Sequence, residues 1–303
     1  TCDGRIAAVR LGAAIREGSM SDGAVTLEQL KPAGSRVVDI PGRWIGGVWE
    51  LITTLLPQLR EDIDAVGPQL SCTMPEEGIA LGRERVFVER GAIVEPQVVF
   101  DVTSGPVLVR AGAQVRAFTR LVGPCAVLAN AIVLGDRVHG CSIGEQSIVR
   151  GEISETIVLG HANKGHDGFV GHSYLGRWVN LGAGTITSNL KNTYGSVQLW
   201  TPEGVRDTGA SKFGSLIGDH AKTGIGTRLT TGTVVGAGSS VFGAKMPPKY
   251  VPPFSWGEGE ALEEFRVAKF LEIAERVMSR RAVTLSECSR RQLSASHAKS
   301  RSG

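Results

Sequence analysis

Two histidines lie in a glycine-rich stretch of the sequence, residues 163–176, although the whole chain contains only 6 histidines. His166 follows Gly165, and His172 follows Gly171. An imidazole gains and loses a proton near neutral pH, and it is also a common zinc ligand. Glycines beside it let a ligand or a neighbouring backbone approach closely. Both side chains are therefore candidates for a general base or a metal ligand, with simple packing as the third explanation.

The composition restricts the classes of protein to which the chain can belong. It is 42% hydrophobic and 21% charged, as in ordinary soluble globular proteins, and its 40 glycines with only 6% aromatic residues favour a turn-rich β fold. A net charge of +3 without a basic, aromatic cluster argues against a nucleic-acid partner. No apolar run approaches the ~20 residues of a membrane span. The 5 scattered cysteines suggest no disulfide framework, so we expect a cytoplasmic protein.

A six-residue period dominates the sequence from residue 80 onward. A first series of aliphatic residues has this spacing: Val109, Val115, Leu121, Val127 and Val133. A second series follows: Ile217, Thr223, Leu229, Val235 and Val241. Hexapeptide repetition predicts a mainly β protein with a parallel β-helix, in which a coil of roughly 18 residues has three short strands. Stacked coils share one core, and residues 190–214 are expected to leave it as a loop.

The segments on either side of the repeats predict helices. Apolar residues at helical spacing before the repeats predict a linker helix over residues 46–67, with a kink at Pro57. The four prolines within residues 245–257 are expected to end the solenoid, because proline cannot continue a sheet ladder. A second helix, over residues 261–281, is predicted to bury one stripe: Leu262, Phe265, Ala268, Leu271 and Ile273. A third is predicted at residues 284–297, starting with a capping box of Thr284 and Glu287.

Residues 163–192, "NKGHDGFVGHSYLGRWVNLGAGTITSNLKN", resemble a known family. They are similar to the acetyltransferase half of the bacterial bifunctional enzymes that acetylate glucosamine 1-phosphate and then uridylylate it. The likeness is strongest to a divergent branch usually described as sugar nucleotidyltransferases, and it runs over residues 40–292. It implies a left-handed parallel β-helix and a homotrimer with active sites between subunits. It also implies acetyl-CoA as the donor and no required metal.

The resemblance implies roles for individual residues of this motif. His166 matches the family's general base, the histidine that precedes Gly182 by 16 residues. Asn180 matches a sugar-binding asparagine. Ala183, between Gly182 and Gly184, matches the small residue whose backbone meets acetyl-CoA.

These roles agree with the chemistry of N-acetylation. An amino sugar is largely an ammonium ion at neutral pH, so its nitrogen attacks a thioester only after a base such as imidazole removes a proton. A backbone N–H of the turn at residues 182–184 would stabilise the oxyanion of the tetrahedral intermediate. His172 is predicted to be a polar corner residue without a chemical role.

Departures from the family's better-known branch affect the contacts to the sugar phosphate. Phe169 stands where that branch has a tyrosine, Ser154 where it has a lysine, and "SNLKN" where it has "CNYDG". We predict that Phe169 lines the substrate site and that Lys164, Lys191 and Arg120 are the cations that bind phosphate. The competing interpretation of each cation is a solvated surface charge.

Two alternative functions remain open at this point. His161 precedes His166 by five residues, which is the spacing of a zinc-binding pair in the γ-class carbonic anhydrases, and His139 would be a third ligand. The substitutions at Phe169 and Ser154 instead suggest a non-catalytic trimeric scaffold. Such a scaffold would not bind acetyl-CoA.

The resemblance also suggests three parts of the chain. Residues 1–79 are interpreted as a remnant of a nucleotidyltransferase-like domain with the linker helix, 80–256 as the β-helix, and 257–303 as helices with a basic tail. The chain starts in mid-pattern at Thr1, so we expect it to be a piece of a longer protein. The stretch "GIGTRL" at 224–229 is similar to a phosphate loop, but its register predicts a repeat corner.

The sequence as a whole predicts an acetyl-CoA-dependent N-acetyltransferase acting on a hexosamine 1-phosphate in nucleotide-sugar synthesis. Uridylyl transfer is not expected, because residues 1–79 are short and have no credible phosphate loop. Two pairs of adjacent arginines lie in the C-terminal segment: Arg280 and Arg281, and Arg290 and Arg291. We expect them either to contact a CoA phosphate of a neighbouring subunit or to lie on a solvated helix face.

Overall fold

The computed structural model describes residues 1–14, 26–72, 75 and 78–300. The chain separates into two compact units, Thr1–Val48 and Trp49–Gly303. The first unit contains α1 (Leu27–Leu30), whose capping box pairs Thr26 with Gln29. All strands belong to the second unit. No helix among the described residues is long and apolar enough to cross a membrane.

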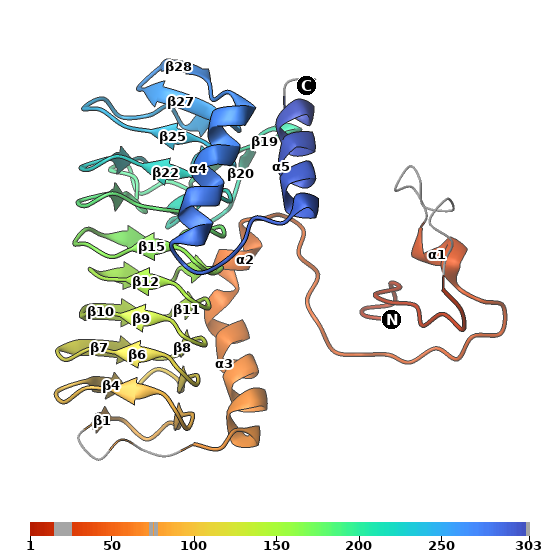
Figure 1. Ribbon diagram of the computed structural model, residues 1–303. Helices are drawn as coiled ribbons and strands as arrows, with labels where there is room; N and C mark the ends of the chain where they lie inside the picture. The colour runs from red at the N-terminus through yellow and green to blue at the C-terminus, as the bar shows by residue number, and fades with distance from the viewer. Residues whose placement is uncertain (15–25, 73–74, 76–77, 301–303) are drawn as a thin grey trace. The chain divides into compact units, whose positions relative to one another are not determined.

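The second unit is a solenoid with three faces of short parallel strands (Figure 1). The first face contains β1 (Ile79–Leu81), β4 (Val99–Asp101), β7 (Thr119–Val122), β10 (Asp136–His139), β13 (Ile153–Ser154) and β16 (Val170–Gly171), continued by β18 (Ile186–Thr187) and β23 (Arg228–Leu229). The second face contains β2 (Val86–Val88), β5 (Val107–Val109), β8 (Cys125–Val127), β11 (Ser142–Ile143), β14 (Ile157–Val158), β17 (Tyr174–Leu175), β21 (Ser215–Ile217), β24 (Thr233–Val235) and β26 (Tyr250–Val251). The third face contains β3 (Ile93–Val94), β6 (Gln114–Val115), β9 (Ile132–Val133), β12 (Ile148–Val149) and β15 (Asn163–Lys164), and then β22 (Lys222–Thr223), β25 (Ser240–Val241), β27 (Ser255–Glu258) and β28 (Ala261–Glu264). The predicted mainly β fold, a left-handed parallel β-helix, is confirmed.

Both six-residue series form the core of the prism. No member of either series exposes more than 6% of its surface. Successive side chains of a strand point to opposite sides of the sheet, so each short strand contributes one inward residue and the next inward position comes about six residues later. Thr223 is the polar member, and its hydroxyl accepts the Gly182 N–H at 3.0 Å and lies 2.8 Å from the Thr185 hydroxyl.

Residues 190–214 leave the coil, as predicted, and fold back onto it as a hairpin. Strands β19 (Gln198–Thr201) and β20 (Gly204–Asp207) pair antiparallel. The side chains of Val197 and Phe213 are fully buried in a cluster that also contains residues of the second face. The excursion therefore covers part of that face.

The predicted linker helix consists of two segments, α2 (Glu50–Thr53) and α3 (Leu55–Val66), and a 3-10 turn (Gly67–Gln69) follows them. The break between the helices falls at Thr54, because Pro57 has no N–H to bond the carbonyl four residues earlier. In Figure 1, α3 lies beside the lower coils of the solenoid. It buries three side chains against the second face: Leu55, Leu59 and Ile63.

The four prolines between residues 245 and 257 do not end the solenoid, so this prediction is wrong. Strand β26 pairs with β24, and β27 pairs with β25, both in parallel. The prolines precede these strands at the corners, where the ladder needs no N–H. The sheet ends instead in the antiparallel pair of β27 and β28.

The C-terminal arm contains α4 (Val267–Ser279) and α5 (Glu287–Lys299), which lie beside the upper coils in Figure 1. The predicted start of the first helix at residue 261 is wrong, because residues 261–264 pair with β27 as strand β28. The buried face of α4 consequently differs from the predicted stripe and consists of Phe270, Ala274 and Met278.

The predicted capping box at Thr284 is also wrong. The N-cap of α5 is Ser286, whose hydroxyl accepts the Ser289 N–H at 3.1 Å. A serine fills this role as well as a threonine, and three hydroxyl residues lie within six positions here, so spacing alone does not select the cap.

Candidate active site

His166 is the only exposed histidine of the six, all of which lie in the described part of the chain. It occupies the corner between β15 on the third face and β16 on the first. Its ring nitrogens have no hydrogen-bond partner among the described residues. An imidazole in this position is free to exchange a proton with a bound ligand.

The other histidines on the first face are held by their neighbours. His139 Nδ1 lies 3.2 Å from the Ser154 hydroxyl oxygen. His172 Nδ1 lies 2.9 Å from Asn189 Nδ2, and its Nε2 lies 3.4 Å from Glu155. Burial lowers the pKa of both imidazoles. His172 is therefore a buried corner residue with a fixed set of partners.

The histidines of the alternative zinc site do not meet. His161 stacks on Trp178 with ring centroids 4.2 Å apart, before β15, whereas His139 belongs to β10 on the first face. Nowhere among the described residues do three His, Cys, Asp or Glu side chains gather in a way that could hold a metal ion. Within one copy of the chain, His139, His161 and His166 therefore do not form the zinc site of the alternative hypothesis.

The corner that carries His166 stacks directly against the turn at residues 182–184. The Gly184 N–H donates to the Asp167 carbonyl at 3.1 Å, which places Asp167 beside Ala183 in the next coil. The Ala183 carbonyl accepts from Gly226 at 2.7 Å, but its N–H has no partner within the part of the chain that the structure describes. A free backbone N–H beside the histidine corner is suited to stabilise a developing oxyanion.

Close stacking explains the glycines on both sides of Ala183. A Cβ on Gly182 would lie 2.5 Å from the backbone carbonyl of Gly224 in the next coil. Gly184 has a φ of +70°, in the left-handed region that residues with a Cβ rarely adopt. The two glycines thus hold the turn in the shape that leaves the Ala183 N–H unpaired.

Asn180 lies on the outer side of the third face, between β15 and β22. It bridges Asn163 on one side and Lys222 on the other. The Asn163 side-chain amide donates to the Asn180 Oδ1 at 3.0 Å. This bond orients the Asn180 side chain and leaves its own amide N–H groups for a ligand hydroxyl.

Lys164 lies inside the prism and not at the surface, which corrects its prediction as an exposed phosphate ligand. It exposes only 1% of its surface. Its Nζ donates to the Arg150 carbonyl at 3.0 Å and to the His166 carbonyl. Burial lowers the pKa of Lys164 to about 8, although Asp167 and Asp136 act in the opposite direction. An ammonium held in this way has no free face for a phosphate.

The remaining predicted residues lie in two places. Arg120 and Phe169 line the same shallow groove of about 690 Å³ on the first face, next to the His166 corner. Arg120 forms an ion pair with Asp101 at 2.5 Å, and hydrogen bonds from Thr103 and then Arg120 lower the pKa of Asp101 to about 2. Lys191 instead donates to the Ser196 carbonyl at the base of the excursion.

Lys222, which was not predicted as a site residue, lies on the third face beside Asn180. A groove of about 520 Å³ between this face and α4 is lined by Lys222, Asn163 and Asn180 together with Arg280 and Arg281. The six-residue register contained the signal. Each of these third-face residues directly precedes an inward position of its strand and must therefore point outward.

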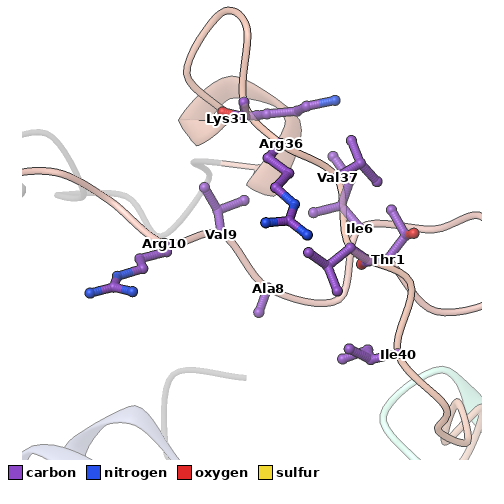
Figure 2. Close-up of a pocket in the computed structure, with 11 residues that line it drawn as sticks. Thr1, Ile6, Ala8, Val9, Arg10, Lys31, Arg36, Val37 and Ile40 are labelled. Carbon is purple, nitrogen blue, oxygen red and sulfur yellow. The ribbon is translucent and has the colours of Figure 1, made fainter.

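Another hollow, of about 510 Å³, lies within the N-terminal unit. Figure 2 shows Arg36 between Val9 and Val37 in this hollow, with Ile6 and Thr1 nearby. No residue predicted for the acetyltransferase site belongs to residues 1–48. The candidate site is consequently confined to the solenoid and its C-terminal arm.

Comparison with known proteins agrees with the motif. No family profile matches the chain. It is 32% identical over 181 residues to the bifunctional protein GlmU of Jannaschia sp. (strain CCS1), a match that covers 57% of this chain and 35% of that protein. The bifunctional protein GlmU of Bartonella quintana (strain Toulouse) is 29% identical over 180 residues, with the same two coverages of 57% and 35%. This chain therefore spans about a third of the length of these curated relatives.

Two further similarities were found. A bifunctional sugar-1-phosphate nucleotidylyltransferase/acetyltransferase of Sulfurisphaera tokodaii is 30% identical over 91 residues, which is 30% of this chain and 23% of that protein. A solved hexapeptide transferase family protein from Anaplasma phagocytophilum covers 75% of this chain and 95% of its own, at 13% identity and a TM-score of 0.33. The resemblance predicted from residues 163–192 is thus confirmed: over more than half of its length, the chain is homologous to the bifunctional GlmU proteins.

Proposed function

We propose that this chain is an acetyl-CoA-dependent N-acetyltransferase whose acceptor is a hexosamine 1-phosphate, with glucosamine 1-phosphate as the first choice. One observation carries the proposal. Among the described residues, the only exposed histidine lies one coil away from a turn whose Ala183 N–H has no hydrogen-bond partner. In the proposed site, a general base and an oxyanion donor therefore lie in adjacent coils of a rigid scaffold. Acyl transfer to an amine uses both groups.

The proposed reaction uses His166 as a general base. The imidazole removes a proton from the substrate ammonium, and the free amine attacks the thioester carbonyl carbon of acetyl-CoA. The Ala183 N–H stabilises the oxyanion that forms on this carbonyl. When the intermediate collapses, the C–S bond breaks and the departing CoA sulfur takes up the proton from His166. The attacking nitrogen, which still carries two hydrogens, loses its second proton to water and becomes the neutral amide. No step of this sequence needs a metal ion.

The relatives support an acyl transfer to a sugar. One of them carries both sugar-1-phosphate nucleotidylyltransferase and acetyltransferase in its name. In the proposed site, Asn180 binds a sugar hydroxyl and Phe169 lines the neighbouring groove, where its ring lies 2.4 Å from the position of a Cβ on Gly171. A glycine at 171 thus makes room for this ring on the first face.

Release of the CoA thiol in the presence of acetyl-CoA and glucosamine 1-phosphate tests the proposal. We expect His166→Ala to lower the rate roughly 100-fold or more, because a positioned general base contributes about 10²–10⁴-fold. His172→Ala is the comparison, since this buried histidine has no role in the proposed reaction. Its rate should stay within a few-fold of the unmodified chain.

The thermal unfolding midpoints of both variants show whether either substitution simply unfolds the protein. Glucosamine and galactosamine 1-phosphate are the alternative acceptors, and N-acetylglucosamine 1-phosphate, whose nitrogen is already acetylated, is the negative control. Thiol release that ignores the amino sugar, or that survives in His166→Ala, would contradict the proposal. A chain that neither releases thiol nor binds acetyl-CoA would be a scaffold.

A further inference from the structure

The groove between the third face and α4 brings three cations together without a carboxylate. Its walls carry Lys222 from β22 and Arg280 and Arg281 from the end of α4. Neither Asp nor Glu occurs among its described lining residues. A pocket of about 520 Å³ lined by one sign of charge attracts ligands of the opposite sign.

Lys222 is the least compensated of the three cations. Its Nζ donates to the His220 carbonyl at a rather long 3.3 Å. Burial lowers the pKa of Lys222 to about 8. Lys222 forms no ion pair with a carboxylate among the described residues. A half-buried ammonium in this situation loses hydration without gaining a counter-ion, and a bound anion would supply the opposite charge.

The two arginines are held at the groove by the fold of the arm. Arg281 donates from Nη1 to the Gln146 carbonyl at 3.2 Å, which ties the segment after α4 to the solenoid. Burial and then the charge of Arg280 lower the pKa of Arg281. By contrast, Arg290 on α5 forms an ion pair with Glu275 at 3.1 Å. Arg280 and Arg281 have no such partner among the described residues, so their charges remain for a ligand.

We propose that this groove binds the phosphate ester of a small substrate, with Lys222, Arg280 and Arg281 as the phosphate ligands. Guanidinium groups donate two parallel hydrogen bonds to phosphate oxygens, and an ammonium adds a point charge. Asn180 lies in the same groove and donates to sugar hydroxyls in the proposed function. We therefore assign the phosphate ester bound in the groove to the sugar phosphate substrate. This assignment rests on the proposed function, whereas the anion site itself does not.

Isothermal titration of the full chain with glucosamine 1-phosphate tests the site without any need for activity. We expect Lys222→Met and the double variant Arg280→Gln/Arg281→Gln each to raise the Kd at least tenfold. Arg206→Gln, on the exposed edge of β20, is the matched loss of a cation elsewhere and should change the Kd less than twofold. Glucosamine without its phosphate should bind equally to all four proteins, and CoA should bind the variants within about twofold of the unmodified chain. Thermal midpoints exclude loss of fold.

Three results would overturn the proposal. Glucosamine 1-phosphate could bind both groove variants as tightly as the unmodified chain, or bind none of the proteins. CoA binding could fall instead, which would assign the groove to a CoA phosphate. The proposed function can fail independently of the groove. If thiol release requires His166 but the groove variants bind glucosamine 1-phosphate normally, only the groove proposal is rejected. If the groove variants lose binding but the unmodified chain releases no thiol, only the acetyltransferase proposal is rejected.

Discussion

Lys164 occupies a position that the neighbouring coils fill with aliphatic side chains. Val149 of β12 pairs beside it, and Leu181 takes the corresponding position in the next coil. A buried ammonium costs free energy unless its donors are bonded, and here two backbone carbonyls accept from it. One of them belongs to His166, so this lysine also ties the corner of the proposed base to the core.

The protonation of Lys164 predicts how stability depends on pH. Its pKa is about 8 in the folded protein against 10.5 ordinarily, so between these values the unfolded chain binds more protons than the folded one. This difference by itself should raise the free energy of unfolding as pH rises from 8 to 10.5, whereas the thiols of Cys125 and Cys141, whose pKa values burial raises, act in the opposite direction above pH 9. Lys164→Met should remove a large part of this rise, as measured by urea unfolding at several pH values in this interval.

Lys269→Met is the matched control for Lys164→Met. Lys269 lies exposed on α4 and pairs with Glu272 at 3.0 Å. Its replacement should leave the dependence of unfolding free energy on pH as it is in the unmodified chain. Lys222 and Lys249, whose pKa values burial also lowers, contribute further rises. Equal slopes in Lys164→Met and the unmodified chain would show that Lys164 is not the source.

The corners between the third and first faces are packed backbone against backbone. Gly182 has its neighbour Gly224 so close that a side chain has no room between the coils. Gly182→Ala should therefore separate the coils and lower the free energy of unfolding by about 1–3 kcal/mol, as overpacking commonly does. It should also lower the proposed acetyl transfer, because the Ala183 N–H moves with the corner. Urea unfolding and thiol release measure the two effects.

Gly195→Ala provides the comparison for Gly182→Ala. The nearest atom to a Cβ on Gly195 is the Thr193 hydroxyl oxygen at 3.9 Å, and its φ is not in the left-handed region. The free energy of unfolding of this variant should lie within about 0.5 kcal/mol of that of the unmodified chain. If both glycine variants are equally stable, the close contact at the corner does not constrain the fold.

Strand and helix ends show where local sequence patterns stop being informative. Residues 261–264 follow the helical pattern of α4, yet they form β28, because the last parallel strand offers an open edge with which to pair. The prolines around Tyr250 lie at corners of the prism, so they cost no ladder hydrogen bonds. Both outcomes depend on which strand lies alongside, and periodicity within one segment does not contain that information.

Several apolar side chains are exposed at or near the corners between the third and first faces, the same row of corners that contains His166 and Ala183. Ile225, in the corner after that of Ala183, is 79% exposed, and Phe118, in an earlier corner of the same series, is 75% exposed. Ile186 on the first face is 44% exposed. We propose that these side chains pack between subunits of a homotrimer, which would bury the apolar surface and enclose the His166 corner.

Sedimentation velocity tests this assembly. The unmodified chain should sediment at three times the monomer mass, and Ile225→Glu or Phe118→Glu should shift it toward the monomer. Thiol release should fall with the trimer, because the proposed site lies between subunits. Val205→Glu, on the hairpin strand β20 and 64% exposed, should leave both unchanged. A monomeric unmodified chain with full activity would contradict the proposal.

The sequence by itself determined the solenoid and the position of the proposed base. A six-residue period is local, since each hexad builds one strand and one corner whatever happens elsewhere, and the inward series could be named in advance. The motif at residues 163–192 predicted roles for His166, Asn180 and the turn around Ala183, which remain predictions, and its resemblance to the GlmU proteins is confirmed.

The six-residue register separates inward from outward side chains, but only the tertiary structure decided which outward charges line one groove. Lys164 and Lys222 are both lysines in short third-face strands, but one points into the prism and the other into the groove beside α4. Arg281 is separated from Asn163 by more than a hundred residues, and their meeting depends on how the arm packs against the coils. The lower exposure of three other histidines also depends on packing between coils, since His139, His161 and His172 contact Ser154, Trp178 and Asn189 of adjacent coils.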